Sequence, residues 1–414
     1  MDKTVIELFA GVGGFRVGLN NIERIDEDGH AIESGNFSFV WANQWEPSTK
    51  AQHAFNCYKK RFENENGVIS NLDISLVNKK DIPNHTLLTG GFPCQDYSVA
   101  RSLSKEKGIE GKKGVLWWQI RDILIAKKTP FVLLENVDRL IKSPAKQRGR
   151  DFGIMLKCMD DLGYAVEWRV INASDYGFPQ RRRRIYIFAY RKTTKFYKSR
   201  IKLENRDIII KDGIFAKAFP ISESISKVKE FDIKLYDDLV QFSNKFSFKF
   251  ENAGFMCNGL ITTCAFEPVT EKAVTLGDIV EFNPDDKYYL DLARIEKFKY
   301  LRGKKKIPRI DAYGHSYFYS EGAMSSFDSL DLPGRTMLTS EGSINRSTHI
   351  IKDPETGKLR LLTPIECERL NEFPDDWTNY GMSERRRYFL MGNALVCGII
   401  KRLGIYIEKI IEGE

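Results

Sequence analysis

One thiol, Cys94, lies in the segment Gly-Gly-Phe-Pro-Cys-Gln-Asp-Tyr-Ser at positions 90–98. The apolar pair Leu87 and Leu88 precedes this Gly/Pro turn, so the pattern predicts a strand that ends at the turn. Chemistry in an open α/β sheet gathers at strand ends of this kind. Because Cys94 lies outside any apolar periodic segment, its position favours a reactive nucleophile over a buried, inert cysteine.

A carboxyl group and a guanidinium cluster also lie at predicted strand ends. Glu135 closes the apolar segment 131–134, and desolvation there is expected to raise its pKa so that it can donate a proton. Arg182 and Arg184 precede the apolar segment 185–189 and share one face, because side chains along a strand repeat with period two. They could lower the pKa of a thiol or bind a phosphate. Taken singly, the carboxylate could instead start a helix, and the arginines could form a solvated patch.

Apolar strands alternate with helical stretches through the first part of the chain. The predicted strands are 5–10, 37–42, 87–89, 131–135, 165–171 and 185–189. Strands that are separated by helices predict an α/β fold with a parallel, doubly wound, Rossmann-like sheet.

A glycine-rich turn follows the first of these strands. Gly11, Gly13 and Gly14 precede a helical stretch, so backbone N–H groups could hold an anionic group, although a purely structural turn would use the same residues. The second strand ends at Trp45, whose ring could stack on a ligand or could simply fill the core.

In order and spacing these elements resemble the cytosine-5 DNA methyltransferases, in particular bacterial type II modification enzymes. The resemblance covers most of 1–190 and 357–414 and includes the segments 113–117, 360–374 and 392–395. Two positions depart from the family pattern: Gln44 stands where an acidic residue usually faces a ribose, and Leu395 stands where Val is more usual.

The resemblance implies S-adenosylmethionine as the cofactor, with its carboxylate at the glycine turn. Either Gln44 or Glu46 is then expected to contact the ribose, and Asp73 the adenine amine. The positions that match the family's cofactor site are Phe9, Ala10, Gly11, Gly13, Gly14, Gln44, Trp45, Glu46, Asp73, Ile74, Gly90, Pro93, Leu116, Asn393 and Leu395.

The resemblance also implies a chemistry for the strand-end residues. The Cys94 thiolate adds to carbon 6 of cytosine, which makes carbon 5 nucleophilic toward a methyl group. Glu135 protonates or hydrogen-bonds ring nitrogen 3, and Arg182 and Arg184 activate the thiol or bind the exocyclic oxygen or a phosphate.

Three regions are expected. Residues 1–190 form the catalytic and cofactor-binding domain, and 191–356, which are basic and irregular, form a smaller target-recognition domain. Residues 357–414 return to the catalytic domain, where the apolar face of the last helix needs a core. The stretch from Cys94 to Arg150 is similar to enzymes that modify GATC, which makes GATC the expected target.

Composition agrees with an enzyme that binds a polyanion. The formal net charge is +8, and 42% apolar residues are enough for a sizeable core. The seven scattered cysteines indicate neither a disulfide framework nor a metal site. We expect a cytoplasmic monomer, without signal peptide or membrane span, that acts on double-stranded DNA and is paired functionally with a restriction endonuclease without necessary contact.

Two other interpretations of the sequence are possible. A tRNA cytosine-5 methyltransferase would use the same scaffold, although the long region 191–356 favours a DNA duplex. A catalytically silent DNA-binding protein would not need Cys94, Glu135 and Arg184 intact.

Overall fold

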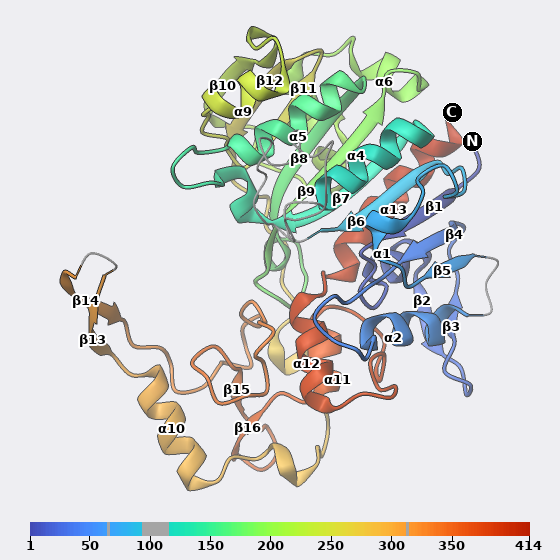
Figure 1. Ribbon diagram of the computed structural model, residues 1–414. Helices are drawn as coiled ribbons and strands as arrows, with labels where there is room; N and C mark the ends of the chain where they lie inside the picture. The colour runs from blue at the N-terminus through green and yellow to red at the C-terminus, as the bar shows by residue number, and fades with distance from the viewer. Residues whose placement is uncertain (64–66, 93–115, 312–313) are drawn as a thin grey trace.

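The computed structural model describes residues 1–63, 67–92, 116–311 and 314–414. Within them, a ten-stranded sheet forms the centre of the protein (Figure 1). The strands in spatial order are β10 (Ser226–Asp232), β12 (Leu260–Ala265), β11 (Ala253–Cys257), β8 (Tyr164–Asn172), β9 (Arg183–Arg191), β7 (Phe131–Val137), β6 (Leu87–Gly91), β1 (Thr4–Leu8), β4 (Ser38–Asn43) and β5 (Val68–Ser70). Separate two-stranded ribbons are formed by β2 (Ile22–Ile25) with β3 (Ala31–Glu33), β13 (Lys305–Ile310) with β14 (Ser316–Glu321), and β15 (Ile350–Lys352) with β16 (Leu359–Leu361).

The predicted α/β class is confirmed, but the sheet is mixed. Strands β5, β4, β1, β6 and β7 are parallel, whereas β9 runs antiparallel to both β7 and β8. The prediction of a parallel sheet was therefore wrong for β9, which is reversed relative to β8, the strand that precedes it in the chain. The segment 173–182 that joins them holds only a short 3₁₀ turn, and a parallel connection needs a longer crossover.

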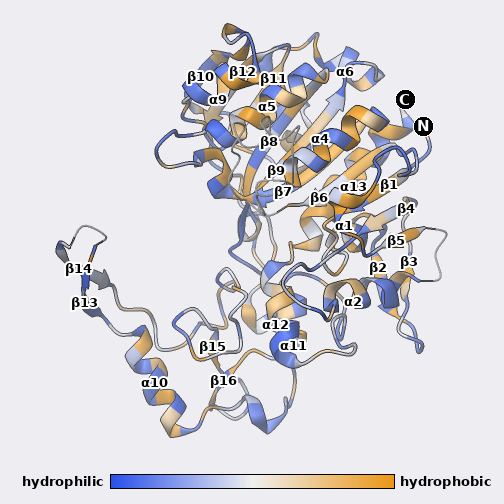
Figure 2. Ribbon diagram, viewed as in Figure 1, coloured by the Kyte–Doolittle hydropathy of each residue, from blue (hydrophilic) through white to orange (hydrophobic). Residues whose placement is uncertain are grey.

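Side chains alternate between two hydrophobic cores, one on each face of the sheet. In β7, Phe131 and Leu133 belong to one core, and Val132 and Leu134 belong to the other. Figure 2 shows hydrophobic residues concentrated along the sheet strands and the helices around them. The helices are α1 (Gly14–Asn20), α2 (His53–Phe62), α4 (Leu116–Lys127), α5 (Arg150–Asp161), α6 (Lys195–Arg200), α7 (Asn205–Asp207), α8 (Ile214–Ala218), α9 (Leu239–Lys245), α10 (Leu292–Arg302), α11 (Pro364–Leu370), α12 (Glu384–Asn393) and α13 (Cys397–Glu412).

The last helix, α13, packs on the same core as α1. Its residues Ile399, Ile400, Leu403 and Ile407 are fully buried, as its apolar face predicts. A Cβ at Gly18 of α1 would lie 2.6 Å from both the Cys397 carbonyl oxygen and Ile400 Cβ. The two helices can therefore approach closely only because position 18 is glycine. The chain termini meet here, and Lys3 pairs with Glu408 at 2.5 Å.

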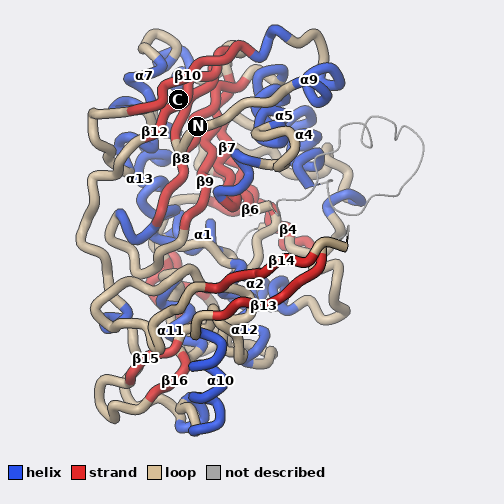
Figure 3. Tube along the Cα trace, turned by 90° about the vertical axis from the view of Figure 1, so that its left-hand side faces the viewer, coloured by secondary structure: helices blue, strands red, loops and turns tan. Residues whose placement is uncertain are grey.

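Part of the region expected to be a separate domain belongs to the sheet. Strands β10, β11 and β12, which lie between residues 226 and 265, extend the sheet beyond β8. The end of the sheet therefore does not coincide with the predicted boundary at 190. The strands from 305 to 361 lie outside the sheet and form a second lobe with α10 (Figures 1 and 3).

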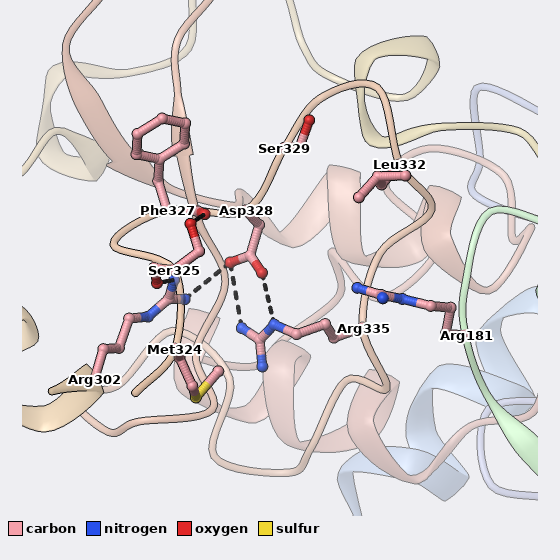
Figure 4. A pocket seen from close by; sticks show the side chains of 9 residues that line it. All are labelled: Arg181, Arg302, Met324, Ser325, Phe327, Asp328, Ser329, Leu332 and Arg335. Carbon is pink, nitrogen blue, oxygen red and sulfur yellow. Dashed lines mark hydrogen bonds and ion pairs between the residues drawn. The ribbon is translucent and has the colours of Figure 1, made fainter. Parts of the chain in front are cut away.

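An aspartate organises this second lobe. Asp328 accepts hydrogen bonds from Arg302 at 2.8 Å, from Arg335 at 2.6 Å and from the Ile350 backbone at 3.0 Å (Figure 4). Asp328 and the two arginines border a cavity of about 260 Å³ into which Arg181 also points. The two arginines hold the pKa of Asp328 well below its usual range, although burial opposes them. Asp328 thus joins the end of α10 to the segment that carries Arg335.

Among the described residues no single helix is both long and apolar enough to cross a membrane, although the bent pair α12 and α13 meets that test jointly.

Candidate active site

Glu135 and Arg184 face one another at the edge of the sheet where β6 and β7 end. Arg184 Nε lies 3.0 Å from Glu135 Oε1, and the two side chains are only 16% and 14% exposed. The contact follows from strand direction: Arg184, the second residue of antiparallel β9, is directly opposite Val137 and so lies at the carboxyl end of β7. The structure therefore brings together the carboxyl group and one of the two arginines singled out in the sequence.

Burial raises the pKa of Glu135, while Arg184 and Arg182 oppose the rise. This direction agrees with the expectation from its apolar flank. A carboxyl group with a raised pKa can hold a proton closer to neutrality, and the neighbouring guanidinium can fix its orientation.

The chain leaves β6 beside Glu135. Gly91 pairs with Glu135 in the sheet, and a Cβ at Gly91 would lie 3.3 Å from Glu135 Oε2. The Asn136 side chain donates a hydrogen bond of 2.6 Å to the Phe92 carbonyl and so fixes the start of the turn. Pro93 and Cys94 follow but lie outside the described residues. Sequence reasoning does not single out Asn136, although its place next to Glu135 is a signal.

Arg182 has a different environment from Arg184. It is buried, and its guanidinium donates to the Met337 carbonyl at 3.2 Å and to the Gly392 carbonyl at 3.0 Å. Burial, reinforced by Arg184, lowers its pKa to about 9. The two arginines, which share one predicted role in the sequence, therefore have different contacts. Arg182 links β9 to the second lobe and to the end of α12.

The six described cysteines are free, and none has the surroundings of a nucleophile. Burial raises the pKa of every one of them, to about 11 for Cys158 and Cys264 and well above its ordinary value for Cys397. A thiol that rarely ionises is a poor nucleophile. Within the described part of the chain, these cysteines are structural.

The glycine turn after β1 is tight and internally bonded. Phe9, Gly11 and Gly13 all have positive φ, at 54°, 56° and 92°, and the Gly13 N–H donates to the Ala10 carbonyl at 2.8 Å. A Cβ at Gly13 would come within 2.8 Å of the Phe62 ring. Glycine is therefore required at position 13 both by backbone conformation and by packing.

Two side chains, Gln44 and Glu7, stabilise this turn and the start of α1 by accepting backbone hydrogen bonds. Gln44 Oε1 accepts a hydrogen bond of 2.7 Å from the Gly11 N–H. Glu7, fully buried on β1, accepts from the Phe15 N–H at 3.2 Å and from the Tyr58 hydroxyl at 3.0 Å. Gln44, the residue that departs from the family pattern, thus contributes to the shape of the turn itself.

The C-terminal segment also reaches the turn. Trp377 Nε1 donates to the Val12 carbonyl at 2.8 Å, and a Cβ at Gly14 would lie 3.0 Å from Leu395 Cγ. Leu395 and its segment 392–395 therefore lie against the start of α1. Asn393 in this segment is exposed.

The other expected cofactor residues differ in their exposure and in the hydrogen bonds that they already form. Trp45 is 39% exposed, which leaves its ring available for stacking. Glu46 is buried; one carboxylate oxygen pairs with Arg386, and the other accepts from the Ala54 N–H at 2.9 Å. Asp73 accepts from the Ser75 N–H at 2.9 Å and hydroxyl at 2.8 Å, and Ile74 is buried.

Gly90 and Leu116 complete the set of described positions. Gly90 lies near the end of β6 beside β1, where a Cβ would lie 3.1 Å from the Leu8 carbonyl oxygen and 3.7 Å from the Phe9 ring. Leu116 begins α4 and is half-buried. The carboxyl ends of β1, β4 and β6 thus lie along one edge of the parallel part of the sheet.

Comparisons with known proteins agree with this geometry. The family model described as C-5 cytosine-specific DNA methylase matches residues 3–409. The chain is 54% identical to type II methyltransferase M.Sau3AI of Staphylococcus aureus, covering 98% of this chain and 95% of that protein. It is 27% identical to M.HhaI of Haemophilus parahaemolyticus, covering 97% and 93%.

Solved structures show the same fold. The Entamoeba histolytica methyltransferase EhMeth superposes with a TM-score of 0.56 at 17% identity and covers 99% of this chain and 98% of that one. S. pombe Dnmt2 methyltransferase gives a TM-score of 0.56 at 16% identity with the same coverage. The resemblance found in the sequence is confirmed: the chain belongs to the C-5 cytosine-specific DNA methylases and is a DNA cytosine-5 methyltransferase.

Proposed function

We propose that the enzyme methylates carbon 5 of a cytosine flipped out of duplex DNA, within a short specific sequence, and that this sequence is GATC. The observation that carries the cytosine chemistry is the Glu135–Arg184 pair beside the start of the turn that leads to Cys94. The target GATC is supported by the similarity of the stretch from Cys94 to Arg150 to enzymes that modify this sequence. Taking a base out of the stack costs a few kcal/mol, which contacts in the active site must offset.

The roles of the strand-end residues follow from their chemistry. The Cys94 thiolate forms a bond to carbon 6, carbon 5 gains the methyl group, and loss of the carbon 5 proton with departure of the thiolate restores the ring. Protonated Glu135 donates to ring nitrogen 3, and Arg184 orients Glu135 and stabilises charge near it. We assign Arg182 a positioning role, because its guanidinium is bound to backbone carbonyls.

S-adenosylmethionine would supply the electrophilic methyl group. The described residues suit it chemically: the glycine turn has the positive φ angles of a backbone that can approach a ligand, and Trp45 offers an exposed ring. Glu46 already has two partners, so we propose that Gln44 and not Glu46 fills the position of the family's acidic residue. Phe9, Gly90, Leu116, Asn393 and Leu395 would line the remainder of the pocket.

We propose that target recognition is carried by the part of 191–356 that lies outside the sheet, and that 357–414 complete the catalytic domain. The packing of α13 on α1 and the contact of Trp377 with Val12 support the second assignment. We further propose a monomer that protects host DNA from a restriction endonuclease with the same target sequence.

The test combines a substrate assay with a map of the modified site. Purified enzyme with labelled S-adenosylmethionine should label duplex DNA and not tRNA, and bisulfite sequencing of DNA from expressing cells should show methylated cytosine within GATC. The matched control is Cys94→Ser, which should label nothing. Labelling of tRNA alone would overturn the choice of substrate, and methylation at another sequence would overturn the target while leaving the activity.

A further inference from the structure

The β13–β14 ribbon is a separate two-stranded element of the second lobe. Six consecutive residue pairs join it, from Lys305 with Glu321 to Ile310 with Ser316, and no described strand extends it on either side. Figure 1 shows it away from the ten-stranded sheet, at the end of the lobe that begins with α10. An isolated two-stranded ribbon is only marginally stable in water, so this one needs additional contacts.

The root of the ribbon is fixed to the lobe. Arg346 donates to Glu321 Oε2 at 3.0 Å, to the Leu301 carbonyl at 3.1 Å and to the Gly322 carbonyl. Lys305 pairs with the same Glu321 at 3.3 Å. The base of the ribbon therefore has a defined position, while the rest of its two strands projects beyond these contacts.

Large apolar side chains on the ribbon face solvent. Phe318 is 68% exposed and Ile310 is 72% exposed, and Tyr317 and Tyr319 are also exposed. Apolar groups clustered in this way mark interaction surfaces in soluble proteins. The exposed apolar side chains therefore indicate that a partner binds to the ribbon.

The charge of the ribbon identifies the partner as a polyanion. Lys304, Lys306 and Arg309 are exposed, and none forms an ion pair within the described part of the chain. Lys305, by contrast, pairs with Glu321. The Arg309 guanidinium carbon lies 4.2 Å from the centre of the Tyr319 ring, so the side chain is held in place without losing its hydrogen-bond donors.

We propose that the β13–β14 ribbon enters the major groove of the target duplex and that Arg309 reads a guanine there. This inference rests on the proposed function and deepens it. The major groove admits a two-stranded ribbon, and the paired donors of an arginine match O6 and N7 of guanine. Arg309 shares its face with Tyr317 and Tyr319, because residues opposite each other in the register project to the same side. Lys304 and Lys306 contact the flanking phosphates.

A chain of contacts connects the ribbon with the active site. Arg302 ends α10 just before the ribbon and binds Asp328, which also binds Arg335 (Figure 4). The segment that carries Arg335 pairs with the one that leads into β9, since the Arg181 N–H donates to the Gly334 carbonyl at 2.7 Å. The position of the ribbon is thereby set relative to Arg184.

The experiment measures how tightly the enzyme binds two duplexes at one salt concentration. One carries the target sequence that bisulfite mapping identifies, and the other carries a scrambled sequence. Arg309→Ala should lower the ratio of specific to non-specific affinity about tenfold or more. Arg309→Lys should also lower it, because an ammonium group lacks the paired donors. The matched control is Arg24→Ala, which removes an exposed arginine from the separate β2–β3 ribbon and should leave the ratio unchanged.

A modified base locates the contact. Replacing guanines of the target one at a time by 7-deazaguanine, which lacks N7, should weaken wild-type binding at one position and should not weaken Arg309→Ala further there. The inference is overturned if Arg309→Ala keeps the wild-type ratio, or if its sensitivity to 7-deazaguanine remains. It is also overturned if the variant changes only the oligomeric state in light scattering. A wild-type enzyme that modifies no duplex would instead refute the proposed function.

Discussion

Glu135 and Arg184 form an ion pair of 3.0 Å across strands β7 and β9, which run in opposite directions. A parallel β9 would have placed its first residues at the far edge of the sheet. The reversal at 173–182 thus brings a guanidinium to the end of β7, where the carboxyl group lies. The Arg184 and Glu135 side chains are both largely buried. Each retains only a small exposed area through which a substrate could reach it.

Glu135→Gln should lower kcat by about 10²- to 10⁴-fold, because an amide cannot transfer a proton to the ring. The Kd for S-adenosylmethionine should change little, since the glycine turn remains intact. Single-turnover methyl transfer and equilibrium dialysis measure the two quantities, and Glu23→Gln on the exposed β2 strand serves as the control. A Glu135→Gln enzyme with normal turnover would remove this residue from the mechanism.

Cys94→Ser should abolish methyl transfer but retain DNA binding, because phosphate and base contacts come mainly from other residues. A duplex with 5-fluorocytosine at the target should trap the wild-type enzyme, since fluorine at carbon 5 cannot leave as a proton. The complex should survive denaturing electrophoresis, depend on S-adenosylmethionine and map by peptide mass to Cys94. An adduct on another cysteine would show that the nucleophile has been misassigned.

Arg182→Ala should mainly lower the stability of the enzyme, whereas Arg184→Ala should mainly lower kcat. Loss of Arg182 leaves the buried Met337 and Gly392 carbonyls without their charged donor and should lower the free energy of unfolding by about 2–4 kcal/mol. Loss of Arg184 should lower kcat by about 100-fold with a smaller loss of stability, because this residue is partly exposed and faces Glu135. Urea unfolding and kcat, measured on both variants, distinguish these roles. Equal effects on both quantities would contradict the division.

Gln44→Ala should weaken binding of S-adenosylmethionine by about fivefold, the equivalent of one hydrogen bond, because the Gly11 N–H loses its acceptor and the turn loosens. Glu46→Gln keeps an oxygen for the Ala54 N–H and should alter this affinity less. Isothermal titration with the cofactor compares them. A larger effect at Glu46 would assign the ribose contact to that residue.

The stability of the enzyme should fall as the pH rises through about 8, because burial raises the pKa of Glu7 to about 8. The folded state retains a proton that the unfolded chain releases above pH 4.5, so the stabilisation is complete below pH 4.5 and lost as the pH approaches 8. The slope is at most about 1.4 kcal/mol per pH unit for one proton. Glu7→Gln should show a shallower decline between pH 7 and 8.5 in urea unfolding, and an unchanged slope would exclude Glu7 as its source.

Local sequence patterns determined much of this architecture. The period-two alternation of apolar residues in β7 specifies which side chains enter each core, and the apolar face of α13 specifies a helix that must be buried. The order of the glycine turn, the Phe-Pro-Cys turn, Glu135 and the arginines sufficed to identify the family. These features can be recognised locally because backbone conformation and the period of a helix or strand depend chiefly on neighbouring residues.

Tertiary structure decided which elements meet. Apolar periodicity records that a strand is buried but not its direction or its neighbour, so the antiparallel β9 and the addition of β10, β11 and β12 to the sheet did not follow from the pattern. Arg182 and Arg184 look equivalent in sequence, yet one binds distant carbonyls and the other binds Glu135. Contacts between residues far apart in the chain made that distinction, because they depend on how complete elements pack against one another.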